Sequence, residues 1–310
     1  MTATVTRPSF RVLRVFRGSN RLNTRFRVAL GKNIPGASRS ISFMPTQTPA
    51  QQRAFFETYG ILKLPGLARD RVDAIIADFE KVFLAHGRKP DGTRRRSIVP
   101  FVDQSAGLSA LLDHPGLLAV VENLLGPDFN YVGSDGNYYT GDTGWHRDSL
   151  YQSNSYIKVA FYLDRVTANT GCLRVIPGSH HDAAIQIWDG TVTAESEANF
   201  GVTGRDIPAV ALENEPGDVL LFNHRVLHSS WGGGSERRMF TMNLGRRAKD
   251  PKEVDDLISY LSYHLRPHGS EPYGQPMLET DSAARKVHLT QPQQFWAAGG
   301  EHYKLRTAKT

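Results

Sequence analysis

Two residues of different chemical type, His146 and Asp148, stand two positions apart in the run GWHRD at 144–148. In an extended strand, side chains two residues apart point to the same side, so this imidazole and this carboxylate would converge. Both groups bind divalent metal ions. A chain with eleven histidines produces such a triplet by chance often. A metal site therefore requires a third ligand from elsewhere in the chain.

The run GDVLLFNHRVLH at 217–228 offers two candidates for that ligand, His224 and His228. Four residues of extended chain span about 13 Å, so the two histidines cannot bind one ion if the segment is a strand. The residues alone leave open which of them does. Two histidines and one carboxylate hold Fe(II) on one side and leave three coordination positions open. Two of these positions fit a bidentate 2-oxo acid and the third fits O2.

A 2-oxo acid with a second carboxylate needs a cation at its far end. Arg237 and Arg238 follow His228 after the run WGGGS at 231–235, a spacing that predicts a hairpin. An arginine on the returning strand could bind the carboxylate through two parallel hydrogen bonds, and Ser230 could add a hydroxyl donor. Neighbouring strand residues face opposite sides, so only one of the two arginines fits. The sequence leaves that choice open.

The elements that position these residues are predicted from the spacing of apolar side chains. Helical spacing occurs at 51–59, 70–84 and 108–125, the last interrupted at Pro115. After Phe129 the apolar runs become short, β-branched and aromatic, and strands are clearest at 156–163, 172–176, 219–222 and 238–244. Strands at this spacing without long helices between them predict a mainly β fold, an antiparallel jelly-roll with flanking helices.

Composition excludes several classes of protein. The chain has 310 residues and one cysteine, Cys172, so an intrachain disulfide and a zinc site built on several thiolates are both impossible. No run approaches the roughly 20 apolar residues of a membrane-spanning helix, so we expect no membrane partner. No glycine-rich phosphate-binding motif stands between a strand and a helix.

The net charge of +6 is concentrated at the amino terminus. Residues 1–43 hold eight arginines, Lys32 and no acidic residue, a charge of +9, so the rest of the chain is net negative by three. A basic surface for nucleic acid is therefore not expected on the folded part. The leader has the composition of a transit peptide, a disordered basic tail, or sequence upstream of a start at Met44. We expect a cytoplasmic protein, or a mitochondrial matrix protein if the leader is a transit peptide, and we exclude residues 1–43 from the fold.

Several motifs together resemble the phytanoyl-CoA dioxygenase family of Fe(II)/2-oxoglutarate-dependent oxygenases. They are FFETYGILKLPGL at 55–67, WHRD at 145–148, NTGCLRVIPGSH at 169–180, GDVLLFNHRVLH at 217–228 and RRMFTMN at 237–243. They follow the family's order over residues 47–245. The resemblance implies a double-stranded β-helix (cupin-like jelly-roll) core, with a single oxygenase domain over 44–310. This domain would comprise a helical part (47–126), the core (129–246) and an extension (247–310).

The same resemblance implies a role for particular residues. His146, Asp148 and His228 would bind iron, and Arg237, Ser230 and Asn137 would bind 2-oxoglutarate. The gap from His228 to the arginine is shorter than in the family, which keeps Arg238 as a rival. Related halogenases carry a small residue at the position of Asp148, so halogenation is disfavoured.

The predicted function is hydroxylation of a C–H bond in a small organic substrate, with O2 and 2-oxoglutarate consumed and succinate and CO2 released. The alternatives are a non-catalytic jelly-roll that binds a metal or ligand, and a metal-dependent isomerase or hydrolase of the cupin type. The substrate is not readable, and neither is the oligomeric state. Loops at 88–105, 149–155 and 181–208 are the candidates for specificity.

Other residues have less specific signals. His224 and His180 are predicted to pack or to fix turns, and Lys158 and Tyr139 either fill the core or face the pocket. The three aromatic residues that either border a substrate or cover the barrel mouth are Trp145, Tyr151 and Trp231.

Overall fold

The computed structural model describes residues 39–40, 47–151, 153, 155–187, 195–264, 272–280 and 282–307. Ser38–Thr310 forms one compact unit. Of the leader, only Arg39–Ser40 belongs to the described residues. The proposed start at Met44 and part of the predicted specificity loops also lie outside the described residues. Arg39–Ser40 pairs in parallel with Val210 and Ala211. This pairing differs from the expectation that the whole leader is excluded from the fold, because an open sheet edge accepts even a two-residue strand.

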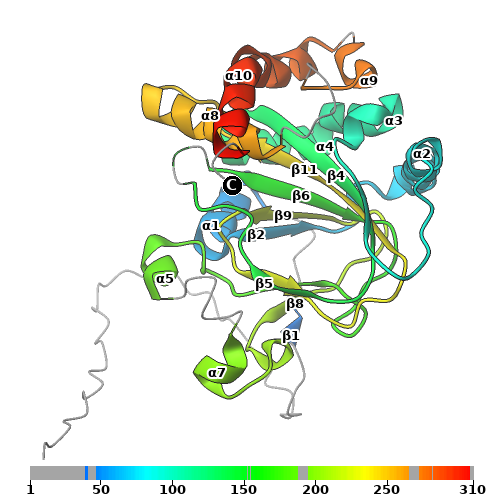
Figure 1. The fold of residues 1–310 in the computed structure, drawn as a ribbon, viewed down its shortest axis with the longest axis vertical. Coiled ribbons are helices and arrows are strands. Elements are labelled where there is room, and N and C mark those ends of the chain that lie inside the picture. Colours follow the sequence, from blue (N-terminus) through cyan, green and yellow to red (C-terminus); the bar gives the residue numbers. More distant parts are fainter. Residues whose placement is uncertain are drawn as a thin grey trace, which may run out of the picture. The chain divides into compact units, whose positions relative to one another are not determined.

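Two sheets form the predicted jelly-roll (Figure 1). The smaller sheet contains, in spatial order, β1 (Arg39–Ser40), β8 (Val210–Leu212), β7 (Leu173–Val175), β10 (His228–Ser230) and β5 (Thr143–His146). The larger sheet contains β2 (Ile61–Leu64), β9 (Val219–Asn223), β6 (Ile157–Tyr162), β11 (Arg237–Gly245), β4 (Asn130–Tyr139) and β3 (Arg96–Ile98). Apart from the β1–β8 pair, the strand pairs are antiparallel. All four strands predicted most clearly are present, with each bound shifted by at most one residue.

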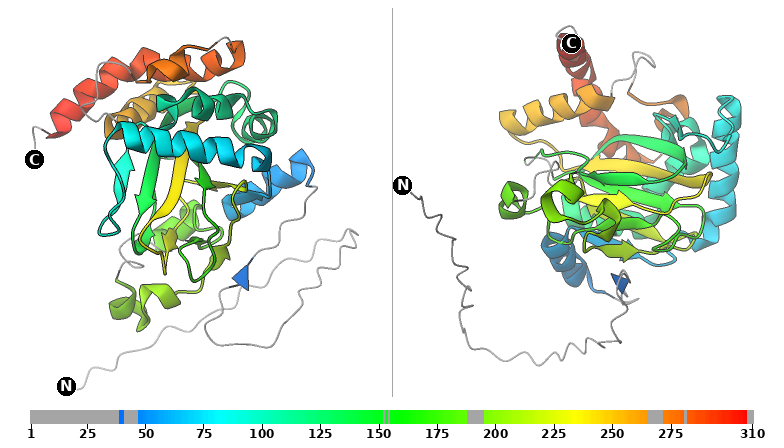
Figure 2. Two further views of the ribbon diagram at one scale, coloured as in Figure 1. Left: turned by 90° about the vertical axis from the view of Figure 1, so that its right-hand side faces the viewer. Right: turned by 60° about the horizontal axis from the view of Figure 1, so that its bottom comes forward.

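The helices lie mainly on the outer face of the larger sheet. They are α1 (Pro49–Tyr59), α2 (Val72–Ala85), α3 (Ala106–Ser109), α4 (Pro115–Leu125), α8 (Pro251–His264), α9 (Gln275–Leu278) and α10 (Ala283–Thr307), with 3-10 turns η1 (Arg69–Arg71), η2 (Val102–Gln104) and η3 (Ala110–Asp113). On the side of the smaller sheet lie α5 (Asp182–Ile187), α7 (Ser196–Phe200) and η4 (Gly204–Asp206). Figure 2 shows α2 lying across the strands of the larger sheet. Among the described residues no single helix is long and apolar enough to cross a membrane, although the bent pair Ala106–Asp113 and Pro115–Leu125 meets the length and composition together.

Two apolar clusters hold these layers together. The first joins the outer face of the larger sheet to the helices and includes Phe79, Leu108 and Phe240, all fully buried. The second lies between the two sheets and includes Leu173 and Phe222. Because the second cluster does not fill the whole space between the sheets, polar residues occupy its remaining end.

Local signals at α1 show why the predicted boundaries hold. Thr48 and Gln51 form a reciprocal capping box at its first turn, and Gly60 ends the helix with φ of 74°. A Cβ on Gly60 would lie 2.4 Å from Val226, so glycine is required there both for conformation and for space.

The C-terminal extension contains α10, which the sequence did not reveal. This helix carries Pro292 in its interior. It packs through Leu289 in the main apolar cluster and through Phe295 and Trp296 against the cluster around Leu257. Buried polar contacts add to this packing: the side chain of Asn130 donates to Gln291 (2.7 Å), and the His288 ring bonds the Phe129 carbonyl (2.9 Å).

Candidate metal and cosubstrate site

The first two predicted ligands lie at the end of β5. His146 is the last residue of the strand, and Asp148 follows just beyond it. The prediction placed both in one strand, whereas the structure holds Asp148 by a backbone bond in which its N–H donates to the carbonyl of His224 (2.9 Å). The two side chains still converge, with His146 Nε2 4.0 Å from Asp148 Oδ1.

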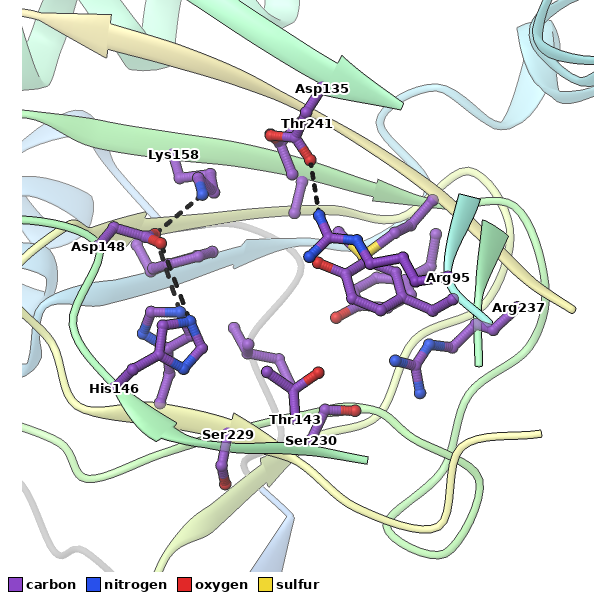
Figure 3. A pocket seen from close by; sticks show the side chains of 17 residues that line it. Arg95, Asp135, Thr143, His146, Asp148, Lys158, Ser229, Ser230, Arg237 and Thr241 are labelled. Atoms are coloured by element: carbon purple, nitrogen blue, oxygen red, sulfur yellow. Dashed lines mark hydrogen bonds and ion pairs between the residues drawn. The ribbon is translucent and has the colours of Figure 1, made fainter. Parts of the chain in front are cut away.

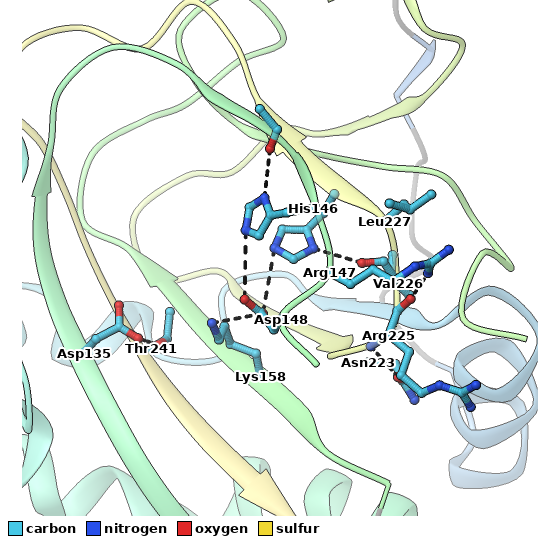
Figure 4. Close-up of polar contacts among 12 residues, drawn as sticks. Asp135, His146, Arg147, Asp148, Lys158, Asn223, Arg225, Val226, Leu227 and Thr241 are labelled. Carbon is cyan, nitrogen blue, oxygen red and sulfur yellow. Dashed lines mark hydrogen bonds and ion pairs between the residues drawn. The ribbon is translucent and has the colours of Figure 1, made fainter. Parts of the chain in front are cut away.

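His228, at the start of β10, completes the group. It lies directly opposite His146 in the β5–β10 pairing. Its Nε2 is 3.8 Å from Asp148 Oδ2, and one ligand atom from each of the three residues lies within 4.8 Å of the others. This group of two imidazoles and one carboxylate could hold a metal ion (Figure 4).

Both imidazoles are set in the tautomer that a metal requires. Nδ1 of His146 lies 2.8 Å from the Gly144 carbonyl, and Nδ1 of His228 lies 2.9 Å from the Val226 carbonyl. A carbonyl only accepts, so each Nδ1 carries the proton and each Nε2 presents its lone pair. Burial lowers the pKa of His228 to about 4, which keeps it neutral at neutral pH.

His224 does not belong to this group. Its ring is buried near the rings of Tyr156 (6.0 Å) and Tyr260 (5.8 Å). Its backbone accepts the N–H of Asp148, so it supports a ligand without facing the centre. The turn between β9 and β10 separates the two histidines and gives them different surroundings.

The group lines one end of a cavity of about 150 Å³ between the sheets (Figure 3). Lys158 faces the same space, and its ammonium lies 3.0 Å from Asp148 Oδ2. Burial alone would raise the pKa of Asp148, but Lys158 and the neighbouring imidazoles hold it well below the ordinary value. Asp148 is therefore ionised throughout the neutral range.

Arg237 and Arg238, at the start of β11, face opposite sides. Arg237 is 6% exposed and lines the cavity, where its Nε and Nη1 have no hydrogen-bond partner among the described residues. Arg238 points away and forms ion pairs with Asp164 (2.6 Å) and Glu80 (2.9 Å). Since a buried guanidinium normally has acceptors, the orphaned atoms of Arg237 fit an anionic ligand such as a carboxylate.

The other two predicted cosubstrate contacts differ in position. Ser230 lines the cavity, and its hydroxyl donates to the Gly171 carbonyl (2.9 Å). Asn137 is fully buried but is not among the residues that line the cavity; its side-chain oxygen accepts from Arg95 (2.8 Å) and Ser97 (2.6 Å). A direct contact of Asn137 with 2-oxoglutarate stays a prediction.

The sequence did not point to the cavity residues Asp135 and Thr241, and it favoured a solvated loop over contact with an anionic substrate for the run 94–96 that contains Arg95. Arg95 lies 4.2 Å from the centre of the Tyr139 ring, which also contacts Arg237 at 5.1 Å. Asp135 pairs with Thr241 across β4 and β11. Alternation from Tyr139 back along β4 would have pointed to Asp135, but nothing in the sequence places the loop that carries Arg95.

The other aromatic and histidine candidates lie elsewhere. Trp145 and Trp231 line a separate cavity of about 440 Å³ beside α7, and Tyr151 packs near Tyr156 and Tyr260. His180 bonds the Glu57 carbonyl through Nε2 (3.1 Å), which agrees with a turn-fixing role.

Comparison with known proteins identifies the chain. The sequence profile of the family described as Phytanoyl-CoA dioxygenase (PhyH) matches residues 56–239, more than half of the chain. The chain belongs to the phytanoyl-CoA dioxygenase family. Among its relatives is a probable phytanoyl-CoA dioxygenase from Caenorhabditis elegans, 25% identical over 272 residues that cover 75% of this chain and 83% of the relative.

Solved structures of similar fold include SnoN and HygX. The epimerase SnoN, solved in complex with Fe3+, alpha-ketoglutarate and nogalamycin RO, superposes with a TM-score of 0.53 at 20% identity, covering 75% of this chain and 96% of SnoN. HygX from Streptomyces hygroscopicus, solved with nickel and 2-oxoglutarate, gives 0.52 at 18% identity, covering 65% of this chain and 88% of HygX. These similarities establish the fold. The predicted family, the jelly-roll fold and the prediction that the chain is a dioxygenase are confirmed. His146, Asp148 and His228 form a group that could hold a metal ion.

Proposed function

We propose that this oxygenase hydroxylates a C–H bond of a small organic substrate, with one oxygen atom of O2 entering the product and the other entering succinate. The observation that carries the proposal is the pairing of two features in one cavity. One end presents two imidazoles and a carboxylate, and the wall presents Arg237 with unpartnered donor atoms.

His146, Asp148 and His228 would hold Fe(II), which supplies the oxidation chemistry together with O2 and 2-oxoglutarate. The protein's part is to fix the three ligands. Each imidazole donates its Nδ1–H to a backbone carbonyl, so neither ring turns or changes tautomer. The retained carboxylate of Asp148 supports hydroxylation over halogenation, because it fills the position that a halide would need.

Arg237 would bind the far carboxylate of 2-oxoglutarate. Its planar guanidinium matches the geometry of a carboxylate and can donate two parallel hydrogen bonds to it. These charged hydrogen bonds are stronger in a cavity shielded from water than in water. The Ser230 hydroxyl lines the same cavity and could turn from the Gly171 carbonyl to the same carboxylate. Phe222, Leu173 and Met239 cover the remaining wall with apolar surface, which excludes water from the target carbon.

Isotopically labelled O2 tests the proposal. With Fe(II), 2-oxoglutarate and a panel of small acids, amines and secondary metabolites, we expect one labelled atom in succinate and one in a hydroxylated product. The Asp148→Ala variant should yield neither. Succinate formation that never couples to oxygen insertion into any compound, or product made without 2-oxoglutarate, would contradict the proposal.

A further inference from the structure

Lys158 is a largely, but not fully, buried lysine in the cavity wall that the proposed reaction does not use. It lies on β6, and its side chain is 16% exposed. Burial of an ammonium is costly unless an anion accompanies it. Among the described residues its ion-pair partner is Asp148, with 3.0 Å between Nζ and Oδ2 (Figure 3).

The backbone anchors both partners to one short segment. Lys158 pairs with Phe222 across β6 and β9. Just beyond, the N–H of His224 donates to the Tyr156 carbonyl (3.0 Å), and the carbonyl of His224 accepts the N–H of Asp148 (2.9 Å). The ammonium and the carboxylate are therefore brought together by strand pairing, unlike the partners of a mobile ion pair on the surface.

The two carboxylate oxygens of Asp148 have different neighbours. Lys158 Nζ (3.0 Å) and His228 Nε2 (3.8 Å) lie beside Oδ2, whereas His146 Nε2 lies 4.0 Å from Oδ1. Resting on the metal site of the proposed function, we propose that Lys158 is a positioning residue that holds Asp148 in the orientation a metal ion needs. Mutation of a residue that binds and orients a metal ligand typically lowers metal affinity by about 10–100-fold.

The charge of Lys158 opposes this effect, and the opposition makes the proposal testable. An ammonium beside the site repels a divalent cation. If orientation of Asp148 dominates, removal of Lys158 weakens metal binding, whereas if repulsion dominates, removal strengthens it. The sign of the change decides between the two.

Calorimetric titration of the full chain with Mn(II), in the absence of 2-oxoglutarate, measures that sign. Lys158→Met fills similar space without charge or donor, and we expect it to weaken Mn(II) binding about tenfold or more. Lys158→Gln keeps one N–H donor and should lose affinity severalfold.

A matched control is Lys63 on β2, which is 17% exposed and lies 2.8 Å from Asp218 Oδ2, away from the cavity. Lys63→Met removes an ion pair of the same kind and should leave Mn(II) affinity unchanged. If both Lys63→Met and Lys158→Met weaken binding equally, the effect is on overall stability and the proposal fails.

Mn(II) binding by Lys158→Met as tight as or tighter than wild type would overturn the inference. If that variant does not fold, unchanged affinity in Lys158→Gln would do so. Asp148→Ala separates this failure from failure of the proposed function. Loss of Mn(II) in Asp148→Ala together with wild-type affinity in Lys158→Met defeats only the role of Lys158, whereas wild-type affinity in Asp148→Ala defeats the metal site itself.

Discussion

Arg237 and Arg238 show how one step along a strand separates function from stability. Arg237 faces the cavity, and its Nε and Nη1 have no hydrogen-bond partner in the part of the chain that the structure describes, whereas Arg238 faces outward onto Asp164 and Glu80. Sequence spacing left the two as rivals, since alternation fixes that they face opposite sides but not which side faces the metal. The register of β11 against β4, with Arg237 opposite Tyr139, supports Arg237.

Conservative substitution of the two arginines should separate these roles. Arg237→Lys replaces a planar fork by a point donor and is expected to raise the apparent KM for 2-oxoglutarate about tenfold or more, from loss of ~1.5–3 kcal/mol of charged hydrogen bonding. Arg238→Lys should leave that KM unchanged and lower the free energy of unfolding by no more than about 1 kcal/mol. Steady-state kinetics and denaturant unfolding on both variants check this. If only Arg238→Lys raised the KM for 2-oxoglutarate, then Arg238 and not Arg237 would bind the cosubstrate.

At the scale of elements, the turn before β7 contacts Arg237, the residue that we propose binds 2-oxoglutarate. Gly171 has φ of 87°, and a Cβ there would lie 1.5 Å from Arg237 Nη1. Its carbonyl also accepts the hydroxyl of Ser230. A side chain at this glycine would displace the guanidinium of Arg237 and would also press on the backbone at Gly233, whose Cα would lie 2.9 Å from the new Cβ.

Gly171→Ala should therefore raise the KM for 2-oxoglutarate severalfold although no binding group is removed. Gly178→Ala is the matched control, because Gly178 also has a positive φ (77°) but its nearest neighbour would be 3.6 Å from the new Cβ. Both variants should lose about 1–2 kcal/mol of stability from the left-handed backbone. Equal KM values for the two variants would show that Arg237 is not held by this turn.

A buried carboxyl group ties the C-terminal extension to the core. Asp103, in η2, is fully buried, and its Oδ2 accepts the N–H of Gly274 just before α9 (2.8 Å). Burial raises the pKa of Asp103 to about 6. Below about pH 4, Asp103 is protonated in both the folded and the unfolded chain. Between about pH 4 and pH 6 the unfolded chain loses this proton while the folded chain keeps it. The unfolded state is therefore favoured, and the free energy of unfolding falls as pH rises.

Asp103→Asn should remove that pH dependence. The difference in pKa corresponds to about 3 kcal/mol of stability lost by the wild type between pH 4 and pH 7. Asp103→Asn has no proton to lose, and its amide oxygen can still accept the N–H of Gly274. The free energy of unfolding of the variant relative to wild type should therefore rise by about 3 kcal/mol between pH 4 and pH 7. Urea unfolding of both proteins at pH 4 and pH 7 measures the gain. A constant difference at the two pH values would mean that Asp103 is not perturbed in the folded chain.

The elements that the sequence predicted well are those with a local signal. Thr48 and Gly60 mark both ends of α1, β-branched and aromatic residues mark β6, and a short, largely apolar run marks β11. By contrast, α10 contains Pro292 and is stabilised by Asn130–Gln291 and similar contacts between residues far apart in the chain. These contacts join residues that are far apart in the sequence, and so does the contact between Arg95 and Tyr139. Residue spacing along the chain therefore could not predict either α10 or the position of Arg95.

At the scale of the whole molecule, charge and fold occupy different parts of the chain. The leader carries +9, whereas the rest of the chain is net negative. Of the leader, the strand Arg39–Ser40 pairs with β8. The sequence of the leader has no periodic apolar face for the core to bury, and transit or other targeting function stays a prediction for it.

Deletion of residues 1–43 should change the free energy of unfolding by less than about 1 kcal/mol, since two residues of edge pairing are lost. Activity in vitro should be retained, because the described residues that line the cavity all come from other parts of the chain. Thermal unfolding and succinate release compare the truncated and full chains. A fall of several kilocalories per mole would show that the leader is part of the folded unit.

The central claim is that His146, Asp148 and His228 hold iron beside a bound 2-oxo acid. Anaerobic titration of the chain with Fe(II) and then 2-oxoglutarate tests it most directly, because the visible metal-to-ligand absorption band requires both on one centre. We expect the band in wild type and in His224→Ala, and its absence in His228→Ala. A band that persists in His228→Ala and disappears in His224→Ala would contradict the assignment, and no band in wild type would contradict the account as a whole.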